Sequence, residues 1–159
     1  MAHQWRIRKA RQSDSTQFLG LVRALADFEH LRPPGVAAGR RMLQEIFRRR
    51  TTSLLVAQSG DTLVGYVLYF YTYSSFLAKP TLYIEDLFVL GERRGSGIGR
   101  ELFLSCVREA VGRGCGRMEW SVLNWNSKAI KFYERLGAKR MDEWSVFRLD
   151  EKALKALRG

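Results

Sequence analysis

The chain has 159 residues, of which 46% are hydrophobic and 27% charged, and it carries 27 Lys and Arg against 16 Asp and Glu. This length and composition exclude a disordered chain and predict one domain, residues 1–159, with a single core. The formal net charge of +11 favours phosphate-bearing or otherwise anionic partners.

The first half of the chain predicts two helices and three strands. Apolar residues recur at helical spacing between Phe18 and Phe28, after possible capping residues at 13–15. Pro33, Pro34 and Gly35 form a turn before the second helix. The predicted elements are, in order, a strand at 4–10, a helix from about 13 to 28, a helix ending in the arginines at 48–50, and strands at 53–58 and 63–73 joined by a turn at 59–61.

The second half of the chain predicts three strands and three helices. Glycines separate these elements, and Asn124 and Asn126 are candidate helix caps. The predicted elements are, in order, a strand at about 82–90, a helix from near 97 to 112, a strand at 117–123, a helix ending at 137, a strand at 144–149 and a short C-terminal helix. This order predicts an α/β fold, a mixed sheet with helices on both faces.

A glycine-rich loop at residues 93–99 (RRGSGIG) lies between an apolar strand and an amphipathic helix. Glycines let the backbone turn sharply and direct its N–H groups at an anion, and the helix N-terminus adds a partial positive charge. Arg94 adds a full charge. The spacing is neither that of a P-loop nor that of a dinucleotide fingerprint. The loop therefore predicts a phosphate site, the alternative being an ordinary turn between strand and helix.

Two carboxylates, Glu85 and Asp86, interrupt the apolar strand at 82–90. Adjacent strand residues point to opposite faces, so at least one carboxylate must lie in or beside the packed interior. Burial would raise its pKa and suit it to act as a base near neutral pH. The alternative is a structural ion pair with an arginine.

Other single residues give weaker signals. Tyr133 lies on the apolar stripe of its helix, where it is either a core residue or, if it reaches a cleft, a general acid. His3 and His30 have no companions at ligand spacing, so we expect no metal. Cys106 and Cys115 match neither a redox pair nor a zinc motif, and we expect both to be reduced and structural.

No stretch of the chain approaches the roughly 18 consecutive apolar residues of a membrane span. The charged N-terminal residues are not followed by the apolar region of a signal peptide. We therefore expect a soluble, cytoplasmic protein that does not associate with membranes.

Three segments together resemble the GNAT superfamily of acetyl-CoA-dependent N-acetyltransferases. They are residues 83–89 (YIEDLFV), the loop at 93–99, and residues 124–126 (NWN) with 132–138 (FYERLGA). Within the superfamily, the chain is most similar to the diamine (spermidine/spermine) N-acetyltransferases, with weaker support at 25–29 and 70–73. The resemblance implies the GNAT fold, whose central sheet is mixed, mostly antiparallel and splayed between its central strands.

The resemblance also implies roles for individual residues. Tyr133 would protonate the leaving CoA thiolate, and Glu85 would help to deprotonate the amine. Backbone N–H groups of the splayed strand would grip the pantetheine and polarise the thioester carbonyl. The implied cofactor-binding residues are Leu87, Phe88, Val89, Arg94, Gly95, Ser96, Gly97, Ile98, Gly99 and Asn126. The implied acceptor-binding residues are Phe28, Glu29, Glu85, Asp86 and Glu143.

We therefore expect an enzyme that transfers an acetyl group from acetyl-CoA directly to a primary amine of a small diamine, polyamine or thialysine-like acceptor. Polyamine enzymes have an acidic residue where this chain has Ser74 and Ser75, which predicts weaker selection for a polycation. The alternative acceptor is a protein lysine or N-terminal amine. A nucleic-acid-binding module is the rival class, but no motif for it is present. The family resemblance also implies a homodimer.

Overall fold

The structure is a computed structural model that describes residues 5–158. Residue contacts divide the chain into two compact units, one ending at Ser121 and the other beginning at Val122. The first unit holds the sheet and most of the predicted site.

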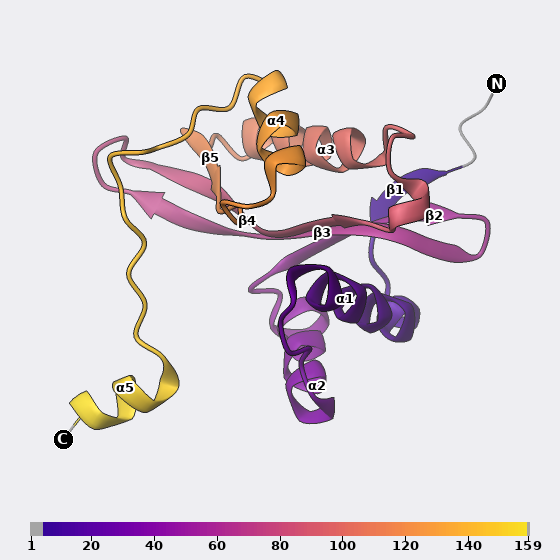
Figure 1. The fold of residues 1–159 in the computed structure, drawn as a ribbon, viewed down its shortest axis with the longest axis horizontal. Coiled ribbons are helices and arrows are strands. Elements are labelled where there is room, and N and C mark those ends of the chain that lie inside the picture. Colours follow the sequence, from indigo (N-terminus) through magenta and orange to yellow (C-terminus); the bar gives the residue numbers. More distant parts are fainter. Residues whose placement is uncertain (1–4, 159) are drawn as a thin grey trace. The chain divides into compact units, whose positions relative to one another are not determined.

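The first unit is built on a five-stranded sheet whose strands follow one another in sequence order (Figure 1). The strands are β1 Arg6–Lys9, β2 Ser53–Ser59, β3 Thr62–Ser74, β4 Lys79–Val89 and β5 Arg117–Trp120. Neighbouring strands run antiparallel from β1 to β4, whereas β5 runs parallel to β4. The parallel pair requires a crossover, which the helix between the two strands provides.

Helices cover both faces of this sheet. Helices α1 (Ser15–Glu29) and α2 (Val36–Gln44) lie on one face, and α3 (Ile98–Gly112) lies on the other (Figure 1). Short helical turns η1 (Gln12–Asp14), η2 (Glu45–Arg49) and η3 (Gly91–Arg93) flank them. The predicted mixed, mostly antiparallel sheet with helices on both faces is thus confirmed.

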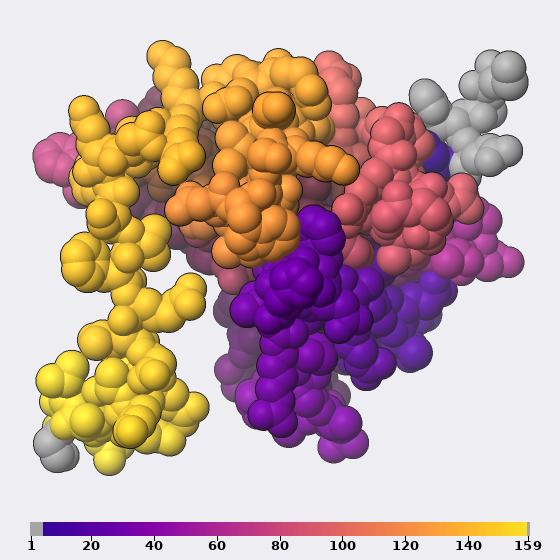
Figure 2. Space-filling model, viewed as in Figure 1, coloured from indigo at the N-terminus to yellow at the C-terminus, as the bar shows by residue number. Residues whose placement is uncertain are grey.

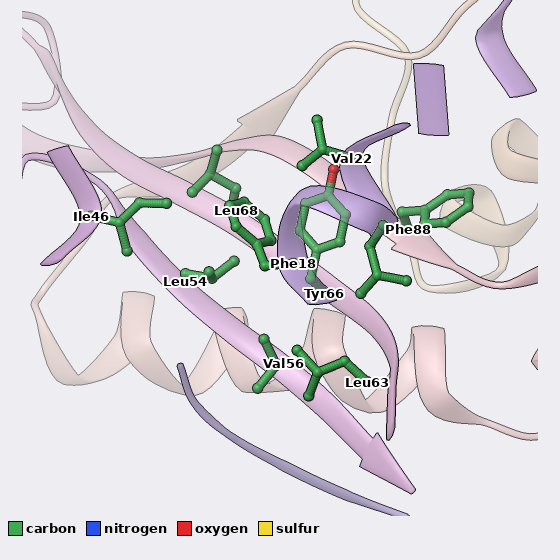
Figure 3. Close-up of a cluster of buried hydrophobic side chains, with 10 residues drawn as sticks. Phe18, Val22, Ile46, Leu54, Val56, Leu63, Tyr66, Leu68 and Phe88 are labelled. Atoms are coloured by element: carbon green, nitrogen blue, oxygen red, sulfur yellow. The ribbon is translucent and has the colours of Figure 1, made fainter. Parts of the chain in front are cut away.

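The core on the α1 side is a cluster of hydrophobic side chains that includes Tyr66, whose hydroxyl is polar. Phe18 and Tyr66 are fully buried, and their rings meet edge to face with centroids 5.1 Å apart. Figure 3 shows the Tyr66 ring between Phe18 and Phe88, with its hydroxyl pointing away from the aliphatic side chains at the other end of the cluster. The cluster comprises Phe18, Leu21, Val22, Ile46, Leu54, Val56, Leu63, Tyr66, Leu68 and Phe88.

A bulge in β4 sets which side chains face this core. Leu68 of β3 pairs with Asp86, but the next residue, Tyr69, pairs with Ile84, so Glu85 is an extra residue on β4. Such a bulge changes which face the following residues point to. As a result, Asp86 and Phe88 lie on the α1 side, while Glu85 is exposed.

Strands β4 and β5 separate after a short pairing. Their register runs from Thr81 with Arg117 to Ile84 with Trp120. Among residues 5–158, no strand pairs with this edge of β4 beyond Ile84. The backbone of residues 85–89 therefore has one unpaired edge, as expected for a splayed pair of central strands.

The second unit contains α4 (Ser127–Arg135) and α5 (Glu151–Leu157). The predicted strand at 144–149 is wrong: these residues form no strand, and Trp144, Val146, Phe147 and Leu149 are exposed. Their apolar composition suits a strand, but a strand also needs a neighbouring backbone to pair with. The predicted strand at 117–123 is shorter than expected, and residue 4 of the first predicted strand lies outside the described residues.

Candidate active site

The carboxylates of the interrupted strand have different environments. Asp86 is partly buried and accepts a 3.0 Å hydrogen bond from the Tyr66 hydroxyl through Oδ2. Glu85, on the bulge, is exposed. The prediction that at least one of the two lies beside the interior is confirmed, and that one is Asp86.

Burial raises the pKa of Asp86 to about 6. The hydrogen bond from Tyr66 opposes this shift, and the negative charges of Glu85 and Glu29 add to it. Burial also raises the pKa of Glu29, at the C-terminal end of α1. The negative charges of Glu29 in α1 and Glu85 in β4 therefore act on Asp86, and we call these three residues the acidic cluster.

Aromatic rings and one arginine lie near this cluster. The guanidinium carbon of Arg94 lies 4.6 Å from the centre of the Phe28 ring and 5.6 Å from that of Phe88. Arg94 Nε also donates a 3.0 Å hydrogen bond to the Val89 carbonyl. The glycine-rich loop is thereby tied both to the end of β4 and to the end of α1.

The glycine-rich loop has the features of an anion site. Gly95 and Gly97 have φ values of +80° and +86°, which residues other than glycine rarely adopt. Gly97 is the N-cap of α3 and has no side chain to cap the helix, so the first-turn N–H groups stay available to a ligand. Residues 91–97 are exposed, and Figure 2 shows this stretch, in salmon, at the surface. These features fit the pyrophosphate of a CoA-type molecule.

Three of the predicted site residues belong to the second unit. Asn126 is the N-cap of α4, and its Oδ1 accepts a 3.2 Å hydrogen bond from the Ala129 N–H. Tyr133 is half-buried in α4, with its ring centre 5.0 Å from that of Phe132. Glu143 lies in the exposed segment before α5.

Sequence reasoning missed Tyr66, which contributes directly to the acidic cluster. An aromatic residue in an apolar strand is typical of a core, and nothing in the sequence links it to Asp86, 20 positions later. Beside Tyr66, β3 approaches β4 closely at Gly65, where an added Cβ would lie 2.8 Å from the Phe88 carbonyl oxygen. A glycine inside an apolar strand often marks a place where two backbones approach closely, and Gly65 is such a glycine.

Other predictions concern cysteines, metals and membranes. Cys106 and Cys115 are both free, as expected. Within residues 5–158, no three His, Cys, Asp or Glu side chains form a group that could hold a metal, while His3 lies outside the described residues. None of the helices in the described chain has the length and hydropathy that a membrane span requires.

Comparison with known proteins identifies the family. The model of the acetyltransferase (GNAT) family matches residues 20–138, which include the acidic cluster and the glycine-rich loop. The chain belongs to the GNAT acetyltransferase family. Enzymes of this family use acetyl-CoA as the acetyl donor, and the predicted family membership is confirmed.

Named GNAT relatives are similar over much of the chain. Thialysine N-epsilon-acetyltransferase from Mus musculus is 32% identical over 166 residues, covering 97% of both chains. L-ornithine N5-acetyltransferase from Arabidopsis thaliana is 46% identical over 99 residues, covering 62% of this chain and 43% of the relative. An integron cassette protein from V. cholerae shares the fold, with a TM-score of 0.80, 20% identity and coverage of 98% of both chains.

Proposed function

We propose that this GNAT acetyltransferase acetylates a primary amine of a small diamine, polyamine or thialysine-like molecule. One observation carries the proposal: the charges of Glu29 and Glu85 act on Asp86, whose hydrogen-bond donor Tyr66 packs in the core with Phe88 and Phe28. Carboxylates and aromatic faces both attract ammonium groups. The named relatives act on thialysine and ornithine, which supports the same acceptor class.

We also propose the residue roles that the family resemblance implies. When bound, acetyl-CoA supplies a thioester whose carbonyl carbon accepts the neutral amine. Glu85, exposed at the bulge, takes a proton from the incoming ammonium, directly or through water. The unpaired edge of residues 87–89 offers backbone N–H groups to the pantetheine and the thioester oxygen.

The remaining proposed roles concern the donor side and the acceptor ammonium. The loop at residues 94–99 binds the pyrophosphate, Asn126 contacts the cofactor, and Tyr133 protonates the leaving thiolate. Glu29 and Asp86 bind a second ammonium group of the acceptor, and the family resemblance implies an acceptor-binding role for Glu143 as well. The family match spans residues 20–138 and crosses the boundary between the two units, which supports one catalytic domain over residues 1–159.

We further propose a cytoplasmic homodimer. The free thiols of Cys106 and Cys115 suit a reducing compartment. Large apolar side chains are exposed along the C-terminal segment, a pattern typical of a surface that a second copy covers. They are Met141, Trp144, Val146, Phe147, Leu149, Leu154 and Leu157.

An acceptor screen with acetyl-CoA, scored by release of free CoA, tests the proposed acceptor class. We expect short diamines, ornithine and thialysine to react, and spermidine and spermine to react with little selectivity over them. Ser74 supports this expectation, because it is buried and its hydroxyl accepts a hydrogen bond from the Leu77 N–H rather than offering a charge. If only lysine-bearing peptides or protein N-termini react, the small-amine proposal is wrong.

A further inference from the structure

We propose that Tyr66 is a positioning residue of the acceptor site: its hydroxyl orients the Asp86 carboxylate toward the acceptor ammonium and sets the pH at which the acceptor binds. The inference deepens the proposed function and rests on it, because it assumes an ammonium-bearing acceptor. Tyr66 carries none of the roles assigned above.

The geometry gives the Tyr66 hydroxyl a fixed position. The side chain is fully buried, its ring meets Phe18 edge to face at 5.1 Å, and the Phe88 ring lies 6.3 Å away on the other side. Figure 3 shows the ring held between these two. The hydroxyl group lies at the edge of the apolar cluster, where it donates a 3.0 Å hydrogen bond to Asp86 Oδ2. A donor held this firmly fixes the direction of the carboxylate that accepts from it.

The charges around Asp86 explain why this donor matters. The titratable groups that act on Asp86 are Tyr66 from β3, Glu85 from β4 and Glu29 from α1. Burial and the two glutamates favour the protonated, neutral form of Asp86, whereas the hydrogen bond from the Tyr66 hydroxyl favours the ionised form. The charged group from the loop after β4 is Arg94, which lies over the Phe28 and Phe88 rings. An ammonium ion binds strongly only to the ionised carboxylate, so the hydroxyl extends acceptor binding to lower pH.

Tyr66→Phe removes this donor and preserves the ring packing. The midpoint of the Asp86 titration should rise by about one pH unit, the pKa equivalent of one hydrogen bond to a charged group. The direct measurement is a carbon-13 NMR titration of side-chain carboxyls in the acceptor-free protein, with the Asp86 signal assigned by its absence in Asp86→Asn. An unchanged midpoint overturns the proposal.

Binding of 1,4-diaminobutane to the CoA-bound protein provides the second readout. Between pH 5 and 8 both amines stay protonated, so a difference between variants at one pH reports groups of the protein. In Tyr66→Phe we expect Kd to rise several-fold near pH 6 and by a smaller factor at pH 8, where Asp86 is ionised in both proteins and only the orienting contact is lost. A rise of the same size at every pH would indicate a structural role and would overturn the proposal.

Tyr69→Phe is the matched control. Tyr69 is also buried in β3, but it lies on the α3 side of the sheet, where Glu109 and Cys106 act on it. In Tyr69→Phe the midpoint of the Asp86 titration and the pH dependence of Kd for 1,4-diaminobutane should match those of the wild type. A midpoint shift equal to that of Tyr66→Phe overturns the proposal.

Two further measurements keep the outcomes separate. If Tyr66→Phe does not fold, the wild-type Tyr66 hydroxyl proton should change its NMR shift with a midpoint near pH 6, and a pH-independent shift overturns the proposal. If 1,4-diaminobutane and the other small amines neither bind to the wild type nor react, the proposed function fails, whereas the carboxyl titration still tests the link between Tyr66 and Asp86.

Discussion

The buried carboxylate of Asp86 should destabilise the protein in the pH range where it is ionised. Its folded-state pKa of about 6 lies above the unfolded value of about 3.9, so the folded state binds a proton more tightly. The destabilisation is absent below pH 4, develops between pH 4 and 6, and is complete above that range. A buried charge kept at such a cost is typical of a functional site.

Asp86→Asn should therefore stabilise the fold while impairing the enzyme. The amide keeps an oxygen that can accept from Tyr66, but it has no charge to bury. We expect the free energy of unfolding to rise by about 3 kcal/mol at pH 8 and by far less at pH 4, as measured by urea denaturation at both pH values. Acceptor turnover should fall. An equal gain at both pH values would contradict a charge effect.

Tyr133 can be tested by removing only its hydroxyl. If it protonates the CoA thiolate, Tyr133→Phe should lower kcat by roughly 10²-fold or more, because the ring packing is kept and the proton donor is lost. Steady-state kinetics with a saturating amine measure this effect. Tyr73→Phe, at an exposed position of β3, is the control and should keep wild-type kcat. A kcat close to that of the wild type in Tyr133→Phe would show that Tyr133 is a packing residue and not the general acid.

At the scale of elements, the junction between β4 and α3 combines a strained backbone with an open helix end. Gly97 ends the loop with a φ of +86°, and an added Cβ would meet only the Trp5 ring, at 3.8 Å. The protein itself therefore leaves room for a small side chain at Gly97. A bound pyrophosphate would leave no room for such a side chain, because it must approach the helix N-terminus closely.

Gly97→Ala should weaken acetyl-CoA binding by more than tenfold, since the new methyl group occupies the space of the pyrophosphate and the backbone is strained. Calorimetric titration with CoA measures the change in Kd. Gly114→Ala controls for strain: Gly114 has a φ of +70°, open surroundings and a position beyond the far end of α3. The control should lose stability and keep its affinity for CoA. Unchanged affinity in a folded Gly97→Ala protein would argue against the pyrophosphate site.

At the scale of the whole molecule, the exposed C-terminal segment bears on the proposed homodimer. Phe147 is 93% exposed and Val146 is 83% exposed. We expect light scattering to give twice the 18.3 kDa chain mass for the wild type, and the mass of one chain for Val146→Asp combined with Phe147→Asp. Two charges at an apolar interface would each be buried without a partner.

Val36→Asp is the control for this experiment. Val36 is also an exposed apolar residue, but it lies at the start of α2, outside the C-terminal segment. Its substitution should leave the measured mass at twice that of the chain. A wild-type protein with the mass of one chain, or a double variant that stays paired, would show that the segment is not a dimer interface.

The sequence alone determined the features that depend on local spacing. The glycine-rich loop before α3, the hairpin turn at residues 60–61 and the cap at Asn126 are each set by residues within a few positions of one another. Apolar runs bounded by turn residues located β2, β3 and β4. Helical periodicity located α1 and α3, because a period of 3.6 residues reflects burial of one face. The family resemblance rests on the same local motifs.

Only the tertiary structure decided the features that need two distant segments. The bulge at Glu85 exists only in the register of β4 against β3, and it determines that Asp86 rather than Glu85 meets Tyr66. The strand predicted at 144–149 failed for the same reason: its composition suits a strand, but no partner in the described chain pairs with it. Strand pairing and the pKa of a buried carboxylate are set by contacts between residues far apart in sequence, which local patterns do not encode.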